Sequence, residues 1–223
     1  MAFGNGPRIV TSGLVLALDA ADRNSYVSGS TTWRDQSGTG RNATLTNGPT
    51  FSSINGGVIV FDGTNDYAVI TSSVSLSEYT FSFFCQWITE TANSSRIFGS
   101  DAFGTYTILT PTNVGFHYNP LGGSPPSVTL SSGVNVGTGT WCQVTVTVSA
   151  AATSVAIYIN GISRNSSSVL PNQNLYNNLY LGAQNTLGLV ANCYIGNFHL
   201  YNRALSATEV LQNYNALKSR FNL

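Results

Sequence analysis

The chain carries little charge. Only 8% of its 223 residues are Asp, Glu, Lys or Arg, and the formal net charge is zero, whereas a typical soluble protein has about 25% charged residues. Nine cations, of which only Lys218 is a lysine, are too few for the basic patch that neutralises phosphates, so we expect no nucleic-acid partner. Zero net charge offers little repulsion between copies, so we expect a homo-oligomer.

Long apolar runs and cysteines are also scarce. No stretch approaches the ~18 apolar residues of a membrane helix, and the start MAFGNGPRIVTSG lacks the pattern of a signal peptide. We therefore expect neither membrane insertion nor secretion. The odd number of cysteines and their spacing do not fit a CxxC metal site. Buried free thiols are favoured over a disulfide at Cys85, Cys142 and Cys193, which fits assembly in a reducing cytoplasm.

Residues for catalysis are few and poorly spaced. The three glutamates are Glu78, Glu90 and Glu209, and the first two flank one predicted strand at opposite ends. A retaining glycosidase needs two carboxyl groups about 5–5.5 Å apart, which two acids on one strand face would supply, and no predicted strand has them. His117 and His199 lie in alternating, strand-like segments, where a structural histidine is the common case. We predict that the protein is not an enzyme.

Alternating apolar and polar residues are abundant. In Thr140–Ile162, Cys142, Val144, Val146 and Val148 fall on one face, which is typical of a half-buried strand. Val155, Ile157 and Ile159 repeat the pattern before Asn160-Gly161, a dipeptide that favours a tight hairpin turn. Further strands are predicted at Leu14–Asp19, Ala43–Thr46, Val58–Phe61, Tyr67–Thr71, Tyr79–Ile88, Arg96–Gly99, Thr105–Thr110, Val114–Tyr118, Val128–Leu130, Leu179–Gly182 and Cys193–Tyr201. We expect Val58–Phe61 and Tyr67–Thr71 to pair as a hairpin.

One helix is predicted, at the C-terminus. Ser206 and Glu209 form a capping box, and Val210, Leu211, Tyr214 and Leu217 make an apolar stripe at helical spacing. About twelve short strands and one terminal helix indicate an all-β fold, an antiparallel two-sheet jelly-roll sandwich whose edge the helix closes. We find no internal repeat and no break in composition. Residues 1–223 are therefore predicted to form a single domain, with residues 1–11 as an extended N-terminal arm.

Several motifs in this order resemble a known family. They are GLVLALDA, WRDQSGTGRNATL, VIVFDGTNDY, WCQVTVTVS with VAIYINGI, and IGNFHLYNRALSATEVLQNYNALKSRF. The set resembles the laminin-G-like branch of the concanavalin A-like lectin/glucanase superfamily over nearly the whole chain. The last motif is similar to domains of bacteriophage structural proteins and of large bacterial surface proteins. A short chain that starts with Met1 and carries no fibre or anchor favours the phage interpretation.

This resemblance implies a non-enzymatic virion protein. It would be a capsid decoration, a head appendage or a tail-associated module, assembled in the host cytoplasm. It would be held by contacts with other virion proteins, and a surface glycan is a further expected partner. The alternative is a stand-alone carbohydrate-binding lectin assisted by calcium.

The best candidate ligand site is the corner FDGTNDY. Asp62, Asn65, Asp66 and Tyr67 gather hard oxygens and one aromatic ring at a strand end. Laminin-G-like domains often carry Ca²⁺ at one rim of the sandwich, which makes Asp62 and Asp66 candidate metal ligands. The same residue types also serve simply to hydrogen-bond their own backbone in a turn. A sugar would instead need an exposed aromatic side chain, and the candidates are Tyr26, Phe103, Tyr106, Tyr118 and Tyr176.

Overall fold

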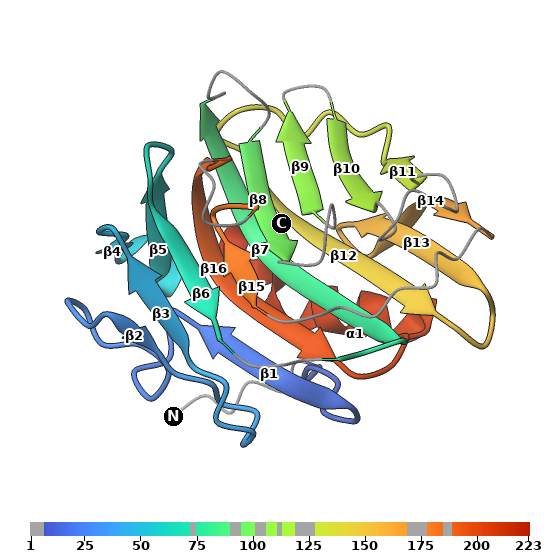
Figure 1. The fold of residues 1–223 in the computed structure, drawn as a ribbon, viewed down its shortest axis with the longest axis horizontal. Helices are drawn as coiled ribbons and strands as arrows, with labels where there is room; N and C mark the ends of the chain where they lie inside the picture. Colours follow the sequence, from blue (N-terminus) through green and yellow to red (C-terminus); the bar gives the residue numbers. More distant parts are fainter. Residues whose placement is uncertain are drawn as a thin grey trace.

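The computed structural model describes residues 7–71, 75–89, 95–100, 106–110, 113–118, 128–168, 178–184 and 189–223. In this part of the chain, sixteen strands form two antiparallel sheets packed face to face (Figure 1). The predicted all-β sandwich with one C-terminal α-helix is confirmed. The division into one domain with an arm at residues 1–11 stays a prediction.

Sheet A contains the central hairpin, which is formed by the two strands predicted within Thr140–Ile162. Its order is β14-β13-β12-β7-β16-β5-β4, and β1 also pairs with β16. Its strands are β1 (Leu14–Asp19), β4 (Thr50–Ser52), β5 (Val58–Asp62), β7 (Tyr79–Thr89), β12 (Trp141–Ser149), β13 (Ser154–Ile159), β14 (Ile162–Ser167) and β16 (Asn192–Tyr201). The predicted turn is present between β13 and β14, because Asn160 and Gly161 both have positive φ and Ile159 pairs with Ile162.

Sheet B follows the order β11-β10-β9-β8-β15-β6-β3-β2. Its strands are β2 (Thr32–Trp33), β3 (Ala43–Thr46), β6 (Tyr67–Ile70), β8 (Ser95–Ser100), β9 (Tyr106–Thr110), β10 (Asn113–Tyr118), β11 (Val128–Ser131) and β15 (Leu179–Leu181). The predicted hairpin of Val58–Phe61 with Tyr67–Thr71 is wrong. Its first segment is β5 of sheet A and its second is β6 of sheet B, so Asp62–Asp66 crosses between the sheets.

The core lies between the two sheets and is rich in aromatic rings. Phe81 of β7 lies 4.3 Å from Phe98 of β8 and 5.7 Å from Phe116 of β10, measured between ring centroids. All three side chains are fully or almost fully buried. Phe81 therefore points from β7 into the space between the sheets, and these contacts join the two sheets.

The loop before β3 is held by one carboxylate. Asp35 Oδ1 accepts hydrogen bonds from the backbone N–H groups of Ala17 (2.9 Å) and Ser37 (2.8 Å), and its Oδ2 accepts from the hydroxyls of Ser37 and Thr39. Burial alone would raise the pKa of Asp35, but these hydrogen bonds lower it overall. Asp35 therefore shapes the turn, and the nearby Trp33 is fully buried.

The C-terminal helix covers the outer face of sheet A instead of closing an edge. In Figure 1, α1 (Ala207–Leu217) is drawn behind the strands of sheet A, and the 3-10 turn η2 (Lys218–Phe221) follows it. Phe221 stacks on the buried Phe84 of β7 with ring centroids 4.4 Å apart. Phe84 lies on the strand face opposite Phe81 and Phe83, so sheet A is buried on both faces. Leu211 was predicted in the apolar stripe, but 43% of its surface is exposed.

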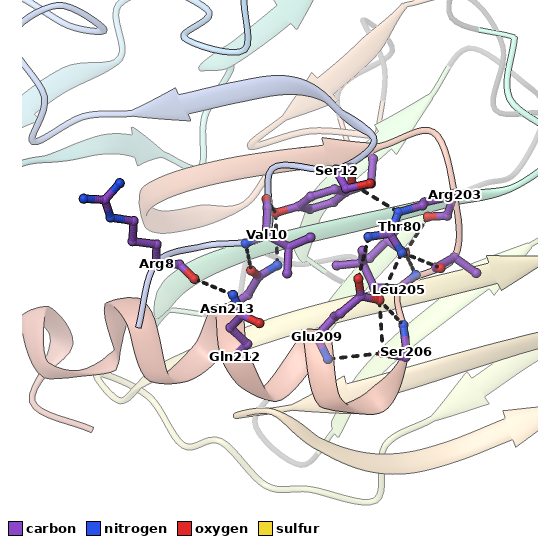
Figure 2. Close-up of polar contacts among 12 residues, drawn as sticks. Arg8, Val10, Ser12, Thr80, Arg203, Leu205, Ser206, Glu209, Gln212 and Asn213 are labelled. Atoms are coloured by element: carbon purple, nitrogen blue, oxygen red, sulfur yellow. Dashed lines mark hydrogen bonds and ion pairs between the residues drawn. The ribbon is translucent and has the colours of Figure 1, made fainter. Parts of the chain in front are cut away.

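A polar clamp ties the chain entering β1 to this helix (Figure 2). The buried Asn213 accepts a hydrogen bond from the Val10 N–H (2.8 Å) and donates one to the Tyr201 hydroxyl (3.0 Å). The same hydroxyl donates to the Val10 carbonyl (3.0 Å), which closes a three-residue network. The predicted capping box is present, and Arg203 forms an ion pair with its Glu209.

Candidate functional site

The predicted corner lies at the rim of the sandwich, where β5 of sheet A leads to β6 of sheet B. Asp62 Oδ1 accepts a hydrogen bond from the Thr64 N–H (2.7 Å), and Asp66 Oδ2 accepts one from the Asp62 N–H (3.2 Å). Gly63 between them has φ +75°, which a glycine adopts without strain. Each carboxylate thus uses one oxygen to hold the backbone turn.

The two carboxylates differ in environment. Asp62 is exposed and Asp66 is buried, with 4% of its surface accessible. Burial raises the pKa of Asp66, a hydrogen bond from the Asp62 backbone lowers it, and the Asp62 charge raises it again. The raised pKa of Asp66 therefore reflects mainly its burial.

The other two predicted residues complete the corner. Asn65 is exposed, and its backbone carbonyl accepts a hydrogen bond from the Asn47 side chain (2.9 Å). Tyr67 is half-buried, and its ring centroid lies 5.9 Å from that of Tyr180. The structure therefore brings all four predicted residues to one rim, although their role in ligand binding stays a prediction.

The donor set at the corner fits calcium in kind. Asp62 and Asp66 each keep a second carboxylate oxygen, and Asn65 offers an amide oxygen, all hard ligands of the type that Ca²⁺ prefers. Among the described residues, no group of three or more His, Cys, Asp or Glu side chains could hold a metal ion. Main-chain carbonyls and water would therefore have to supply most of the six to eight ligands.

The residues considered for catalysis have structural roles where the structure describes them. Glu78 accepts hydrogen bonds from the Ala151 N–H (2.9 Å) and the Ser149 hydroxyl (3.3 Å). Glu209 belongs to the capping box and ion pair, while Glu90 lies outside the described residues. His199 is buried in sheet A, and burial lowers its pKa to about 4.

His117 is half-buried on β10, and its Nδ1 lies 2.8 Å from the Thr129 hydroxyl. All three cysteines are buried, and Sγ of Cys85 lies 3.8 Å from Sγ of Cys142 across β7 and β12.

Of the five aromatic candidates for sugar stacking, the structure describes the side chain of Tyr26 alone. Tyr26 is 4% exposed, and its hydroxyl donates to the Ser30 carbonyl (3.0 Å), so it is not the free platform considered from the sequence. Phe103 and Tyr176 lie outside the described residues, as do the side chains of Tyr106 and Tyr118.

Two neighbouring hollows that the sequence did not indicate lie beside Tyr26. The first has a volume of about 360 Å³ and lies between the loop through Ser28–Thr31 and the loop entering β4. The second, of about 580 Å³, lies between Ala20–Ser28 and the turn after β4. Tyr26, Ser28 and Phe51 line both hollows. Phe51 belongs to a three-residue strand, which is too short for alternation to reveal.

Among the described residues, no helix is long and apolar enough to cross a membrane.

Comparison with solved structures finds bacterial toxin binding domains with the same fold. The binding domain of Paraclostridial Mosquitocidal Protein 1 matches with a TM-score of 0.74 and 16% identity, over 92% of this chain and 52% of that one. The receptor binding domain of botulinum neurotoxin type G matches with a TM-score of 0.69 and 18% identity, over 91% of this chain and 51% of that one.

A third similar structure is the ligand binding domain of botulinum neurotoxin serotype D in complex with N-acetylneuraminic acid. Its TM-score is 0.72 with 15% identity, over 92% of this chain and 51% of that one. The chain thus spans about half the length of these binding domains.

At the level of sequence, no curated protein matches the chain. A laminin-G-type family model, described as the concanavalin A-like lectin/glucanases superfamily, matches residues 62–211. The match includes the candidate corner, the central hairpin and the first five residues of the C-terminal helix, 207–211. This match shows that the chain belongs to the concanavalin A-like lectin/glucanase superfamily.

Proposed function

We propose that this chain is a non-enzymatic binding module of a phage virion, either a capsid decoration or head appendage or a tail-associated module. Protein–protein contacts hold it in place, several copies act together, and its rim recognises a surface glycan. The observation that carries the binding role is the coverage of the fold, because 92% of the chain aligns with a structure that is named a binding domain.

The charge and the acids of the chain support a role without catalysis. The described glutamates, Glu78 and Glu209, are both engaged in holding backbone or a neighbouring side chain. Zero net charge favours the association of copies. The virion location rests on the similarity of the C-terminal motif to phage structural proteins. The same motif contains Tyr201 and Asn213, which hold the chain at Val10.

The test of this function is the copy number of the chain in purified particles of its source. Quantitative mass spectrometry would measure it against the major capsid protein. Hundreds of copies per particle are expected for a capsid decoration, and a few to a few dozen for a tail or vertex module. Absence from the particles would refute the virion role.

A calcium-assisted lectin is the second candidate, favoured by the two neighbouring carboxylates at the corner. Ca²⁺ should then raise the melting temperature of the wild type, and a chelator should lower it again. Asp62→Ala should remove that response, because it deletes an exposed carboxylate of the set. An unchanged melting temperature with Ca²⁺ would refute the calcium site.

A further inference from the structure

The two hollows beside Tyr26 lie next to each other and share three lining residues, Tyr26, Ser28 and Phe51, so together they make one candidate site. Their common wall is a pair of stacked rings, with the centroids of Tyr26 and Phe51 5.7 Å apart at an interplanar angle of 27°. Tyr26 is fixed behind Phe51 by burial and by its hydrogen bond to Ser30. Phe51 is therefore a supported ring that faces both hollows, and a ligand spanning them would pass over it.

The lining suits a polyhydroxylated ligand. Each hollow combines the Phe51 ring with hydroxyl side chains, from Thr31 and Thr50 in the first and from Ser53 in the second. Ser28 contributes to the rim of both. An apolar ring face with hydroxyls around it matches the alternating C–H and O–H surfaces of a pyranose.

The lining of the two hollows carries a single positive charge. Arg23 is the only charged side chain that lines either hollow, and it is exposed. In the part of the chain that the structure describes, Arg23 has no ion-pair partner. A guanidinium binds a carboxylate through two parallel hydrogen bonds, so an acidic sugar unit in the second hollow would gain this contact.

We propose that these hollows bind an acidic oligosaccharide of at least two units. One unit lies in the first hollow, the chain crosses the Phe51 ring, and a sialic or uronic acid unit in the second hollow pairs its carboxylate with Arg23. This proposal rests on the glycan recognition in the proposed function and places it at the loop before β2 and the edge strand β4. The predicted corner adjoins this site, because a Cβ on Gly48 in the first hollow would lie 3.8 Å from Asp66 Oδ1.

The binding test is a titration of the ¹⁵N-labelled chain followed by NMR. The acidic probes are sialyllactose and a galacturonic acid disaccharide, and the matched neutral probes are lactose and cellobiose. The acidic probes should shift the backbone amides of residues 23–31 and 50–53. The neutral probes should bind roughly tenfold more weakly, since they lack the charged hydrogen bonds to Arg23.

Two surface variants test the site without disturbing the core. Arg23→Gln removes the cation, and Ser28→Tyr places a bulky side chain on the rim shared by the hollows. Each should weaken binding of the acidic probes by roughly tenfold or more. Arg164→Gln and Ser163→Tyr make the same changes on the exposed strand β14 and should bind like the wild type.

Several results would overturn the proposal. Among them are no shift at the hollows with any probe, equal affinity for neutral and acidic probes, and wild-type affinity in both surface variants. Shifts confined to residues 62–67 would place the glycan at the corner instead. An extended peptide that shifts residues 50–53 where the sugars do not would assign the β4 edge to a protein partner. The copy number in particles is independent of all these outcomes, so the virion role and the sugar site fail separately.

Discussion

Protonation of His199 should destabilise the fold in acid. The His199 side chain is buried on β16 of sheet A, with 5% of its surface exposed. Its Nδ1 lies 3.4 Å from Nδ2 of Asn197, which makes a long hydrogen bond. Burial is the main cause that lowers its pKa from 6.5 to about 4, with Asp19 raising it and Arg220 lowering it again. Asp19 and Arg220 form an ion pair at 2.6 Å, which largely offsets their two effects.

The sign and size of the effect follow from linkage. The unfolded chain binds the proton near pH 6.5 and the folded protein only near pH 4, so falling pH favours the unfolded state within that window. The stability that depends on a neutral His199 is fully present above about pH 6.5 and is lost as the pH falls to about 4. The difference corresponds to about 3 kcal/mol at 25 °C.

Urea unfolding of the wild type and of His199→Gln at several pH values between about 7 and 4 measures this contribution. The wild type should lose about 3 kcal/mol more than the variant over this range. His117→Gln is the control, because His117 is only half-buried, and it should keep most of the wild-type pH dependence. The pKa of Glu209 is lowered from 4.5 to about 2, chiefly by Arg203, so this group begins to affect stability below about pH 4.5. It does so in the wild type and the variant alike, and the difference between the two proteins still reports on His199. Equal pH dependence in wild type and His199→Gln would refute the argument.

Three further changes test the clamp, the cap and the packing. Asn213→Leu leaves the Val10 N–H without its buried partner and should lower the free energy of unfolding by about 3 kcal/mol in urea; a loss below about 1 kcal/mol would contradict the clamp. Ser206→Ala removes the helix cap and should cost about 1 kcal/mol, whereas Thr208→Ala at an exposed helical position should be nearly neutral. Gly182→Ala should cost about 3 kcal/mol, because φ is +78° and the new Cβ would press into the buried Phe61 ring; an unchanged melting temperature would refute this packing argument.

Local patterns were sufficient to predict most elements of the fold. The period of two in Trp141–Ser149 is set by the strand itself, so it predicted the inward valines without knowledge of any neighbour. The turn at Asn160-Gly161 and the capping box of Ser206 with Glu209 depend on residues a few positions apart, and both are present. The four residues of the candidate corner lie within the short stretch 62–67, so the sequence already placed them together.

Only the tertiary structure decided what depends on distant partners. Phe84 reads as an outward residue of β7, and it is buried because Phe221, 137 positions later, packs on it. The crossing from β5 to β6 looked like a hairpin because two adjacent strands with a short corner have the same local pattern whether or not they share a sheet. Tyr26 and Phe51 make their hollows by long-range stacking that leaves no periodic signal. The sequence therefore determined the strands, turns and cap, whereas the choice of sheet, the buried outer face and the concave site came from packing between segments far apart in the chain.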